Sequence, residues 1–171
     1  QVVIKCLKPV MHTKLQREHK VLTTLKGQPN VVTLRECVRD DVSLPAFTYD
    51  YINSSDWKQL FPKLADIDIR HYMFQLLRAL DRCHKKGVMH RDVKPHNMVF
   101  DQVSKRVRLI DFGLAEFYHP GQEYNSRVAS RHYKGPELLA SPTEDMGKIM
   151  GSIHDVSLFG KLNFVDGVQV A

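Results

Sequence analysis

Four polar side chains in two short segments have the types and spacing that could carry chemistry. Asp92 is followed after two residues by Lys94 and after five by Asn97, and Asp111 comes fourteen residues later, directly after the strand-like residues 107–110. Carboxylate and amide oxygens are the hard ligands that Mg²⁺ prefers, and a carboxylate can also take up a proton. These residue types suit magnesium-assisted chemistry, and the surrounding motifs indicate which reaction it is.

The two segments match two motifs of the protein kinases. Residues 90–97 have the form H-R-D-x-K-x-x-N, and residues 111–113 form D-F-G directly after a strand, where that motif is expected. D-F-G alone would be a weak signal, whereas the ordered pair is a strong one. The chain therefore resembles the eukaryotic protein kinases, which transfer the γ-phosphate of ATP to a hydroxyl group.

This resemblance implies a role for each of the four side chains. Phosphoryl transfer depends on positioning the reactants and neutralising phosphate charge. Asp92 would orient the acceptor hydroxyl and take its proton, and Lys94 would place a cation near the transferred group. Asn97 and Asp111 would bind Mg²⁺.

Upstream, the chain resembles the kinase strand V-A-I-K at Val3-Ile4-Lys5. The resemblance implies that Lys5 contacts the α- and β-phosphates of ATP and that Glu18 is its ion-pair partner. Taken alone, Lys5 would be a solvated strand lysine and Glu18 a surface helix residue, but the downstream motifs favour the ion pair. His90 is expected to be a packing residue rather than a catalytic one, in a stack with Leu22, Leu34 and Phe112.

The residues around these motifs show a closer resemblance. Residues 91–97, 114–125, 127–131 and 134–139 are similar to the catalytic subunit of casein kinase II, and Gly135 stands where most kinases have the alanine of A-P-E. The similarity runs from about residue 2 to residue 139. It implies a serine/threonine kinase that uses ATP, and sometimes GTP, with Mg²⁺ and phosphorylates acidic protein substrates.

The same resemblance assigns the substrate and nucleotide contacts. Arg127, Arg131 and Lys134 would read the acidic residues of the substrate, and residues 124–136 contain no acid that offsets these cations. A solvated basic loop is the alternative. Asn53 would lie on the ribose side of the nucleotide. The expected adenine pocket consists of Val3, Val32, Tyr49, Asp50, Ile52, Val99 and Ile110.

The elements that must position these residues can also be predicted. The clearest is a helix over 66–87, in which apolar residues recur every three or four positions, with Asp66 as the expected N-cap and Gly87 at the C-terminus. A second helix, which carries Glu18, is expected to begin with a capping box at Thr13. The remaining predicted elements are strands over 1–7, 31–38, 44–52, 98–101 and 107–110 and a short helix over 56–64.

Along the chain, the predicted elements are first strands with one helix among them and then mainly helices. This order and the resemblance predict an α+β fold of the two-lobe protein-kinase type. We expect this fold to be incomplete, with a partial N-lobe and hinge over 1–52, a partial C-lobe over 53–139 and a divergent tail over 140–171. The chain contains no G-x-G-x-x-G loop, and the family's pattern is not recognisable after residue 139. The resemblance therefore predicts truncation at both ends.

Composition narrows the choice of partner and location. Residues 1–140 hold 23 basic and 15 acidic groups, whereas residues 141–171 hold two basic and four acidic groups. The excess of basic groups in residues 1–140 suggests an anionic partner. A nucleic-acid-binding module is disfavoured because zinc-ligand spacing and an aromatic RNP-like strand are absent. No apolar run is long enough to span a bilayer, so no membrane partner is expected. Three widely spaced cysteines favour a reducing compartment. Since members of the resembled family occur in the cytoplasm and nucleus, we expect this protein in the same compartments.

Two hypotheses about activity stay open. The chain is either a working kinase segment or a kinase-derived fragment without activity that at most binds a nucleotide or a partner. Met11-His12-Thr13-Lys14 replaces a lysine cluster of the family, which should weaken the recognition of acidic substrates and polyanions. Binding of the family's regulatory subunit uses N-lobe strands that are largely absent here and is expected to be lost.

Overall fold

The structure, a computed structural model, describes residues 1–7, 12–38, 45–54, 56–101, 103–125 and 127–134. Met11, Gly135 and the tail over 140–171, on which some of the predictions rest, lie outside the described residues. Within those ranges, no helix is both long and apolar enough to cross a membrane.

The described elements mix short strands with helices, which confirms the predicted α+β class. In chain order they are β1 (Val2–Cys6), α1 (His12–Thr24), β2 (Leu34–Val38), β3 (Ala46–Asp50), α2 (Trp57–Leu60), the 3-10 turn η1 (Phe61–Lys63), α3 (Asp66–Lys85), β4 (Val88–Met89), η2 (Pro95–Asn97), β5 (Met98–Asp101), β6 (Arg106–Leu109), β7 (Glu116–Phe117) and η3 (Arg131–Tyr133).

The first three strands form an antiparallel sheet in the order β1-β3-β2. In its register Val3 lies opposite Tyr49, and Lys5 lies opposite the fully buried Phe47. The strand predicted over 31–38 begins only at Leu34, because Val31 forms a parallel bridge with Leu109 instead. The sheet therefore connects directly to the β5–β6 hairpin that precedes Asp111.

Helix α3 has the predicted apolar stripe, but its N-terminus differs from the prediction. Tyr72, Leu76, Leu80 and Cys83 are buried. Ala65 is the N-cap and Asp66 the first helical residue, because the carboxylate of Asp68 accepts a hydrogen bond from the Ala65 N–H. The predicted capping box at Thr13 is also wrong, since α1 already begins at His12. Gly87 follows α3 with φ of 68°, a left-handed conformation that suits glycine at a helix C-terminus.

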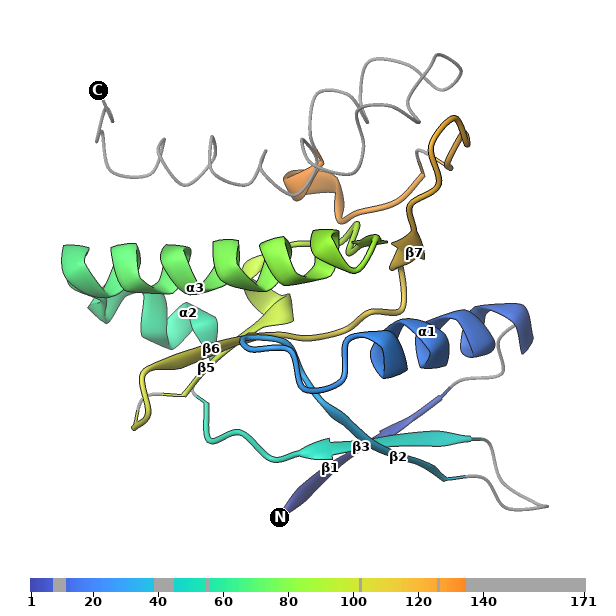
Figure 1. The fold of residues 1–171 in the computed structure, drawn as a ribbon. Helices are drawn as coiled ribbons and strands as arrows, with labels where there is room; N and C mark the ends of the chain where they lie inside the picture. Colours follow the sequence, from blue (N-terminus) through green and yellow to red (C-terminus); the bar gives the residue numbers. More distant parts are fainter. Residues whose placement is uncertain (8–11, 39–44, 55, 102, 126, 135–171) are drawn as a thin grey trace.

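The larger of two hydrophobic clusters among the described residues connects most of these elements. It joins residues of α1, the sheet, α3 and the β5–β6 hairpin, among them Leu22, Leu34, Leu76 and Leu109. Figure 1 shows α3 on one side of the hairpin and α1 with the three-stranded sheet on the other. Burial of side chains of this size contributes roughly 1.5–3 kcal/mol each, so the shared core fixes the relative positions of the strands and loops that carry polar residues.

Candidate active site

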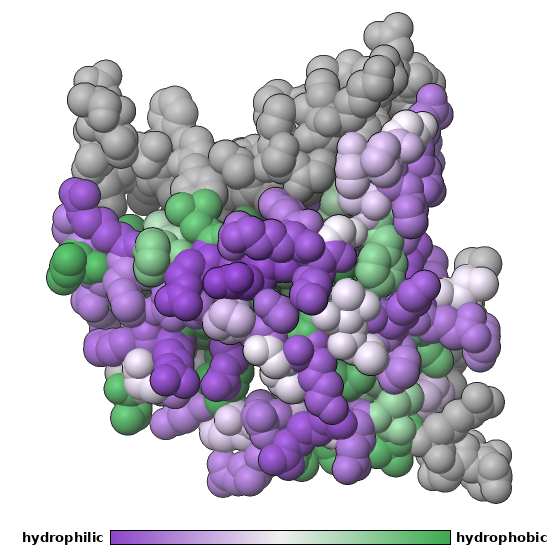
Figure 2. Space-filling model, viewed as in Figure 1, coloured by the Kyte–Doolittle hydropathy of each residue, from purple (hydrophilic) through white to green (hydrophobic). Residues whose placement is uncertain are grey.

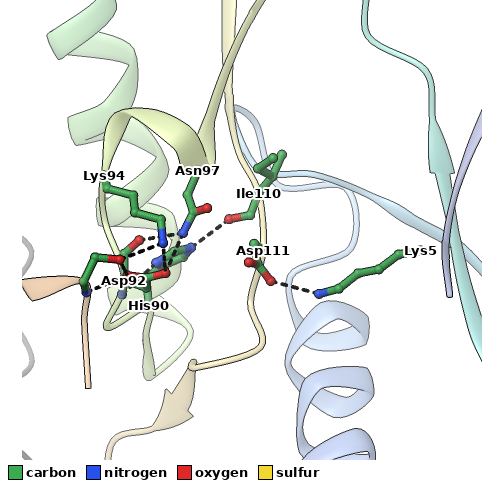
Figure 3. Close-up of polar contacts among 8 residues, drawn as sticks. Lys5, His90, Asp92, Lys94, Asn97, Ile110 and Asp111 are labelled. Carbon is green, nitrogen blue, oxygen red and sulfur yellow. Dashed lines mark hydrogen bonds and ion pairs between the residues drawn. The ribbon is translucent and has the colours of Figure 1, made fainter. Parts of the chain in front are cut away.

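The loop between β4 and η2 holds Asp92 as the centre of a polar network (Figure 3). Lys94 Nζ donates to Asp92 Oδ2 over 2.7 Å, and Asn97 Nδ2 donates to Asp92 Oδ2 over 2.9 Å and to the Asp92 carbonyl over 2.8 Å. Asp92 is 6% exposed. A buried carboxylate that is held from several sides keeps one orientation, as a group that must accept a proton from a bound hydroxyl requires.

Ser130 completes this network and was missed by the sequence analysis. Its N–H and its hydroxyl both lie 3.0 Å from Asp92 Oδ1, and Lys94 Nζ donates to its Oγ over 2.8 Å. The hydroxyl thus accepts from the lysine and donates to the carboxylate. Ser130 lies between two predicted substrate-binding residues, Arg127 and Arg131, and this position was the only signal in the sequence.

His90 packs against Phe112, as predicted, and it also forms hydrogen bonds that the sequence analysis did not predict. It is fully buried, and its ring meets the Phe112 ring edge-on at 4.8 Å between centroids. His90 Nε2 donates to the carbonyl of Ile110 over 3.0 Å, and its Nδ1 accepts from the N–H of Asp92 over 3.2 Å. These two roles require a neutral ring with the proton on Nε2. The histidine therefore joins the Asp92 loop to the segment that carries Asp111.

Lys5 brings two acidic residues from distant parts of the chain together. Its Nζ lies 2.8 Å from Glu18 Oε1 and 2.8 Å from Asp111 Oδ1. Burial alone would lower the pKa of Lys5, but the hydrogen bonds to Asp111 and Glu18 outweigh it and raise the pKa. Burial would raise the pKa of Asp111, but the hydrogen bond from Lys5 lowers it below its ordinary value. Both groups are therefore held in their charged forms.

The backbone around Asp111 lies close to this contact. Asp111 has a φ of 60°, a left-handed conformation that is uncommon for a residue other than glycine. A Cβ atom on Gly113 would lie 3.4 Å from Asp111 Oδ1 and 3.7 Å from Glu18 Oε2. These are ordinary van der Waals distances, so Gly113 borders both carboxylates without being required for their approach to Lys5.

Glu116 of β7 forms a second polar link, and the sequence analysis gave it no role. Its Oε2 pairs with Arg17 Nη1 of α1 and lies 3.8 Å from Arg91 Nη2. The buried guanidinium of Arg91 also donates through Nε to the Leu114 carbonyl over 2.8 Å. Burial lowers the pKa of Arg91, and the charge of Glu116 opposes that shift. Arg17 precedes Glu18 in α1, so Glu116 connects the helix that carries Glu18 to the Asp92 loop.

A cavity of about 580 Å³ lies beside Lys5 and Asp111. All seven residues predicted for the adenine pocket line it, together with Ile4, Tyr51 and Ser54. Burial, followed by the charges of Glu18 and Asp111, raises the pKa of the Tyr49 phenol, so this tyrosine stays neutral. Asn53 does not line the cavity but an adjoining depression, which it shares with Asp50 and Ile52. The cavity has the size and the mainly apolar walls that suit a planar organic ligand.

Both predicted magnesium ligands, Asn97 and Asp111, have the chemistry for that ion. Asn97 uses both Nδ2 hydrogens on Asp92, so its Oδ1 is the atom left to meet a cation, and Asp111 supplies a carboxylate held in its charged form. In the described part of the chain, no three His, Cys, Asp or Glu side chains converge as a metal site. A pair of oxygen ligands fits Mg²⁺, which keeps several waters and takes further oxygens from phosphates.

The predicted substrate-binding residues lie on both sides of Ser130, which contacts Asp92. The Arg127 side chain is exposed, and its N–H donates to Asn125 Oδ1 over 2.8 Å. The 3-10 turn η3 contains Arg131, whose side chain lies outside the described part, and Lys134 follows η3. These cations therefore flank Ser130, the residue that contacts Asp92, and the structure does not test what they bind.

The geometry brings the buried, oriented carboxylate of Asp92, the Lys5–carboxylate contacts, two oxygen groups suited to a cation and an apolar cavity together. The family model described as protein kinase domain matches residues 1–152, which extends beyond residue 139, where the similarity to casein kinase II was seen to end. This match covers most of the chain and assigns it ATP, Mg²⁺ and protein substrates in general terms. The chain therefore belongs to the protein kinase domain family.

Proposed function

We propose that this chain is a serine/threonine kinase segment, similar to the catalytic subunit of casein kinase II, that phosphorylates acidic proteins. The observation that carries the proposal is the position of Asp92, which Lys94, Asn97 and Ser130 hold in one orientation. This carboxylate would receive the proton of a serine or threonine hydroxyl while the hydroxyl oxygen bonds to the γ-phosphorus and ADP leaves.

The other residues of the site prepare the nucleotide for this step. Lys5, oriented by Glu18, would bind the α- and β-phosphates, and Lys94 would neutralise charge on the transferred group. The cavity beside Lys5 would hold adenine, or guanine where GTP is used. Asn97 and Asp111 would hold Mg²⁺, which supplies charge neutralisation to the phosphates when bound.

The preference for acidic substrates rests on the resemblance and on the basic composition of residues 127–134, which include Ser130. Arg127, Arg131 and Lys134 are the cations that would pair with carboxylates of the substrate. We also propose, from the resemblance and cysteine usage, that the protein acts in the cytoplasm and nucleus.

A phosphotransfer assay tests this proposal. The chain is incubated with Mg²⁺ and radiolabelled ATP and with three peptides: one carrying serine before several glutamates, its tyrosine counterpart, and one carrying serine before lysines. The expected result is label in the acidic serine peptide alone, with a loss of at least about 100-fold in Asp92→Asn. Transfer no greater than in Asp92→Asn would favour the inactive fragment, and equal labelling of all peptides would refute the acidic preference.

A further inference from the structure

A second hollow, of about 570 Å³, lies on a different part of the molecule from the site above. Its walls come from the 27–33 segment, one face of α3 and the end of the β5–β6 hairpin, and none of its lining residues lines the cavity beside Lys5. In the view of Figure 2, the surface over α3 and this hairpin is mainly hydrophilic, with scattered hydrophobic residues. The proposed function uses none of it.

The walls of this hollow are fixed to one another by a buried amide. Gln75 of α3, 5% exposed, accepts hydrogen bonds from Asn30 Nδ2 and from the N–H of Val107, each over 2.8 Å. Its Nε2 donates to the carbonyl of Lys105 over 2.7 Å, and Asn30 also donates to the carbonyl of Val107 over 2.8 Å. Since one side chain connects all three walls, the hollow is preformed and does not require rearrangement to accept a ligand.

The charge of the hollow is strongly one-sided. Four cations line it, Arg78, Lys105, Arg106 and Arg108, and no acidic residue does. Among the described residues, no carboxylate lies within ion-pair distance of these four. Asp101 lies opposite Arg106 in the strand register, and its carboxylate is bonded to Ser104. Hydrogen bonds from Ser104, and to a smaller degree the charge of Arg108, lower the pKa of Asp101, so this acid interacts with Arg108 without forming an ion pair.

Aromatic rings, rather than carboxylates, support two of these cations. The Arg78 guanidinium lies 5.8 Å from the centroid of the Phe74 ring, and Lys105 Nζ lies 5.7 Å from that of Phe100. A cation–π contact orients a charge without neutralising it. The cations are thereby positioned while their charge remains to be compensated, which favours the binding of an anion.

We infer that this hollow is a docking site for an acidic peptide segment. The surface of the hollow combines cations with an exposed aromatic ring, since Phe74 is 57% exposed beside Arg78. An extended peptide with several carboxylates and one apolar side chain complements both features. Protein kinases act on protein substrates, so the substrate itself can supply such a segment at a distance from its phosphorylated residue. Only the inference that the docked segment belongs to the kinase substrate rests on the proposed function.

A direct binding measurement tests the site without relying on catalysis. A fluorescein-labelled peptide of glutamates with one central phenylalanine is titrated with the Asp92→Asn protein in the absence of nucleotide, and anisotropy is recorded. The charge-removing pair Arg78→Gln and Arg106→Gln is compared with Lys63→Gln and Lys86→Gln, an exposed pair outside the hollow that loses the same charge.

The dissociation constant is expected to rise at least about tenfold in the hollow variant and less than about twofold in the control. It should also rise in both wild type and control as salt is increased. Equal weakening in both variants would show a non-specific charge effect and overturn the inference, as would an absence of binding. Tighter binding of a single-stranded oligonucleotide than of the peptide would assign the hollow to nucleic acid instead.

A second measurement connects the site to turnover. With Asp92 intact, the hollow variant should keep the kcat and KM of wild type on a short acidic peptide, and only its KM for a longer substrate with a remote acidic segment should rise. If the peptide binds but this KM does not change, the docked peptide does not belong to the substrate. If binding is confirmed and no phosphotransfer occurs, the proposed function fails while the docking site stands.

Discussion

Glu116→Gln tests whether the link between α1 and the Asp92 loop supports both stability and catalysis. The substitution keeps the shape of the side chain but removes the charge that lies between the guanidinium groups of Arg17 and Arg91. Arg91 is 6% exposed on its side chain, so it cannot replace the lost carboxylate with water. The carbonyl of Leu114 would remain as its hydrogen-bond acceptor.

The size of the effect follows from this burial. Removing one partner of a fully buried ion pair costs about 3–5 kcal/mol, and a hydrogen bond to a charged group is worth about 1.5–3 kcal/mol. Because Glu116 is itself 22% exposed and its second contact is 3.8 Å long, the lower range applies, about 2 kcal/mol. For a protein of this size that corresponds to a fall in Tm of about 4–8 °C.

Catalysis should fall together with stability. Arg17 and Glu18 are neighbours in α1, so loosening the helix reduces the fraction of molecules in which Glu18 holds Lys5. A fall in kcat of about tenfold is expected, equivalent to about 1.4 kcal/mol. Tm is measured by circular dichroism and kcat at a temperature well below both transitions, with Glu116→Asp as a second variant that retains the charge.

The control is Asp81→Asn, which removes an exposed ion pair with Lys85 on α3. If Glu116→Gln changes Tm no more than this control does, the link contributes nothing to stability. If Tm falls as expected but kcat stays at the wild-type value, the coupling between Glu116 and the Lys5–Glu18 pair is refuted. A partial recovery of kcat in Glu116→Asp would identify the charge as the cause.

Three other perturbations test separate contacts. Ser130→Ala removes the hydroxyl between the catalytic-loop lysine and acid, so kcat should fall about tenfold while KM for ATP changes by less than about twofold; an unchanged kcat would contradict its role. The Lys5–Asp111 pair should stabilise the fold fully between about pH 4 and about pH 10. That stability is lost as pH falls through the lowered pKa of Asp111 or rises through the raised pKa of Lys5, so the plot of Tm against pH should flatten at both edges in Lys5→Met. An identical curve would contradict the pairing. Gln75→Leu leaves the buried N–H of Val107 without its acceptor and removes one hydrogen bond each from Asn30 and the Lys105 carbonyl, which keep other partners. It should lower the free energy of unfolding by about 1–3 kcal/mol, measured by urea denaturation, and a change below about 0.5 kcal/mol would exclude the amide as the fixed point of the hollow.

Local patterns predicted the elements better than their ends. The 66–87 helix was predicted because its apolar spacing reflects burial on one face, and the structure buries Tyr72, Leu76 and Leu80 as expected. The capping errors at Thr13 and Asp66 arose because a residue type that favours an N-cap is also tolerated inside the first turn. The late start of β2 could not be predicted, since it depends on the pairing of Val31 with Leu109, far along the chain.

The residues of the site also fall into a group that local motifs predicted and a group that they did not. Motifs indicated the residues that would act, because each motif is local, and the structure brings Lys5, Glu18 and Asp111 into contact. Ser130 and Glu116 were missed because their importance depends on contacts across 38 and 99 positions of the sequence, to Asp92 and Arg17 respectively. A serine and a glutamate in a loop are ordinary surface residues until the fold places them beside charges.

These missed contacts explain how the site keeps its geometry. Arg91 and Asp111 both have left-handed backbone conformations, with φ of 64° and 60°, which cost free energy and persist only where neighbouring contacts hold them. His90 connects the Asp92 loop to the segment before Asp111, Lys5 connects β1 and α1 to Asp111 itself, and Glu116 connects α1 back to Arg91. Each pair among these three parts of the chain is thus joined by at least one polar contact, so no part can shift without breaking contacts to both of the others. The strained residues lie where these contacts meet, so the network that orients Asp92 also compensates the backbone strain. Activity and stability should therefore fall together when any residue of the network is removed.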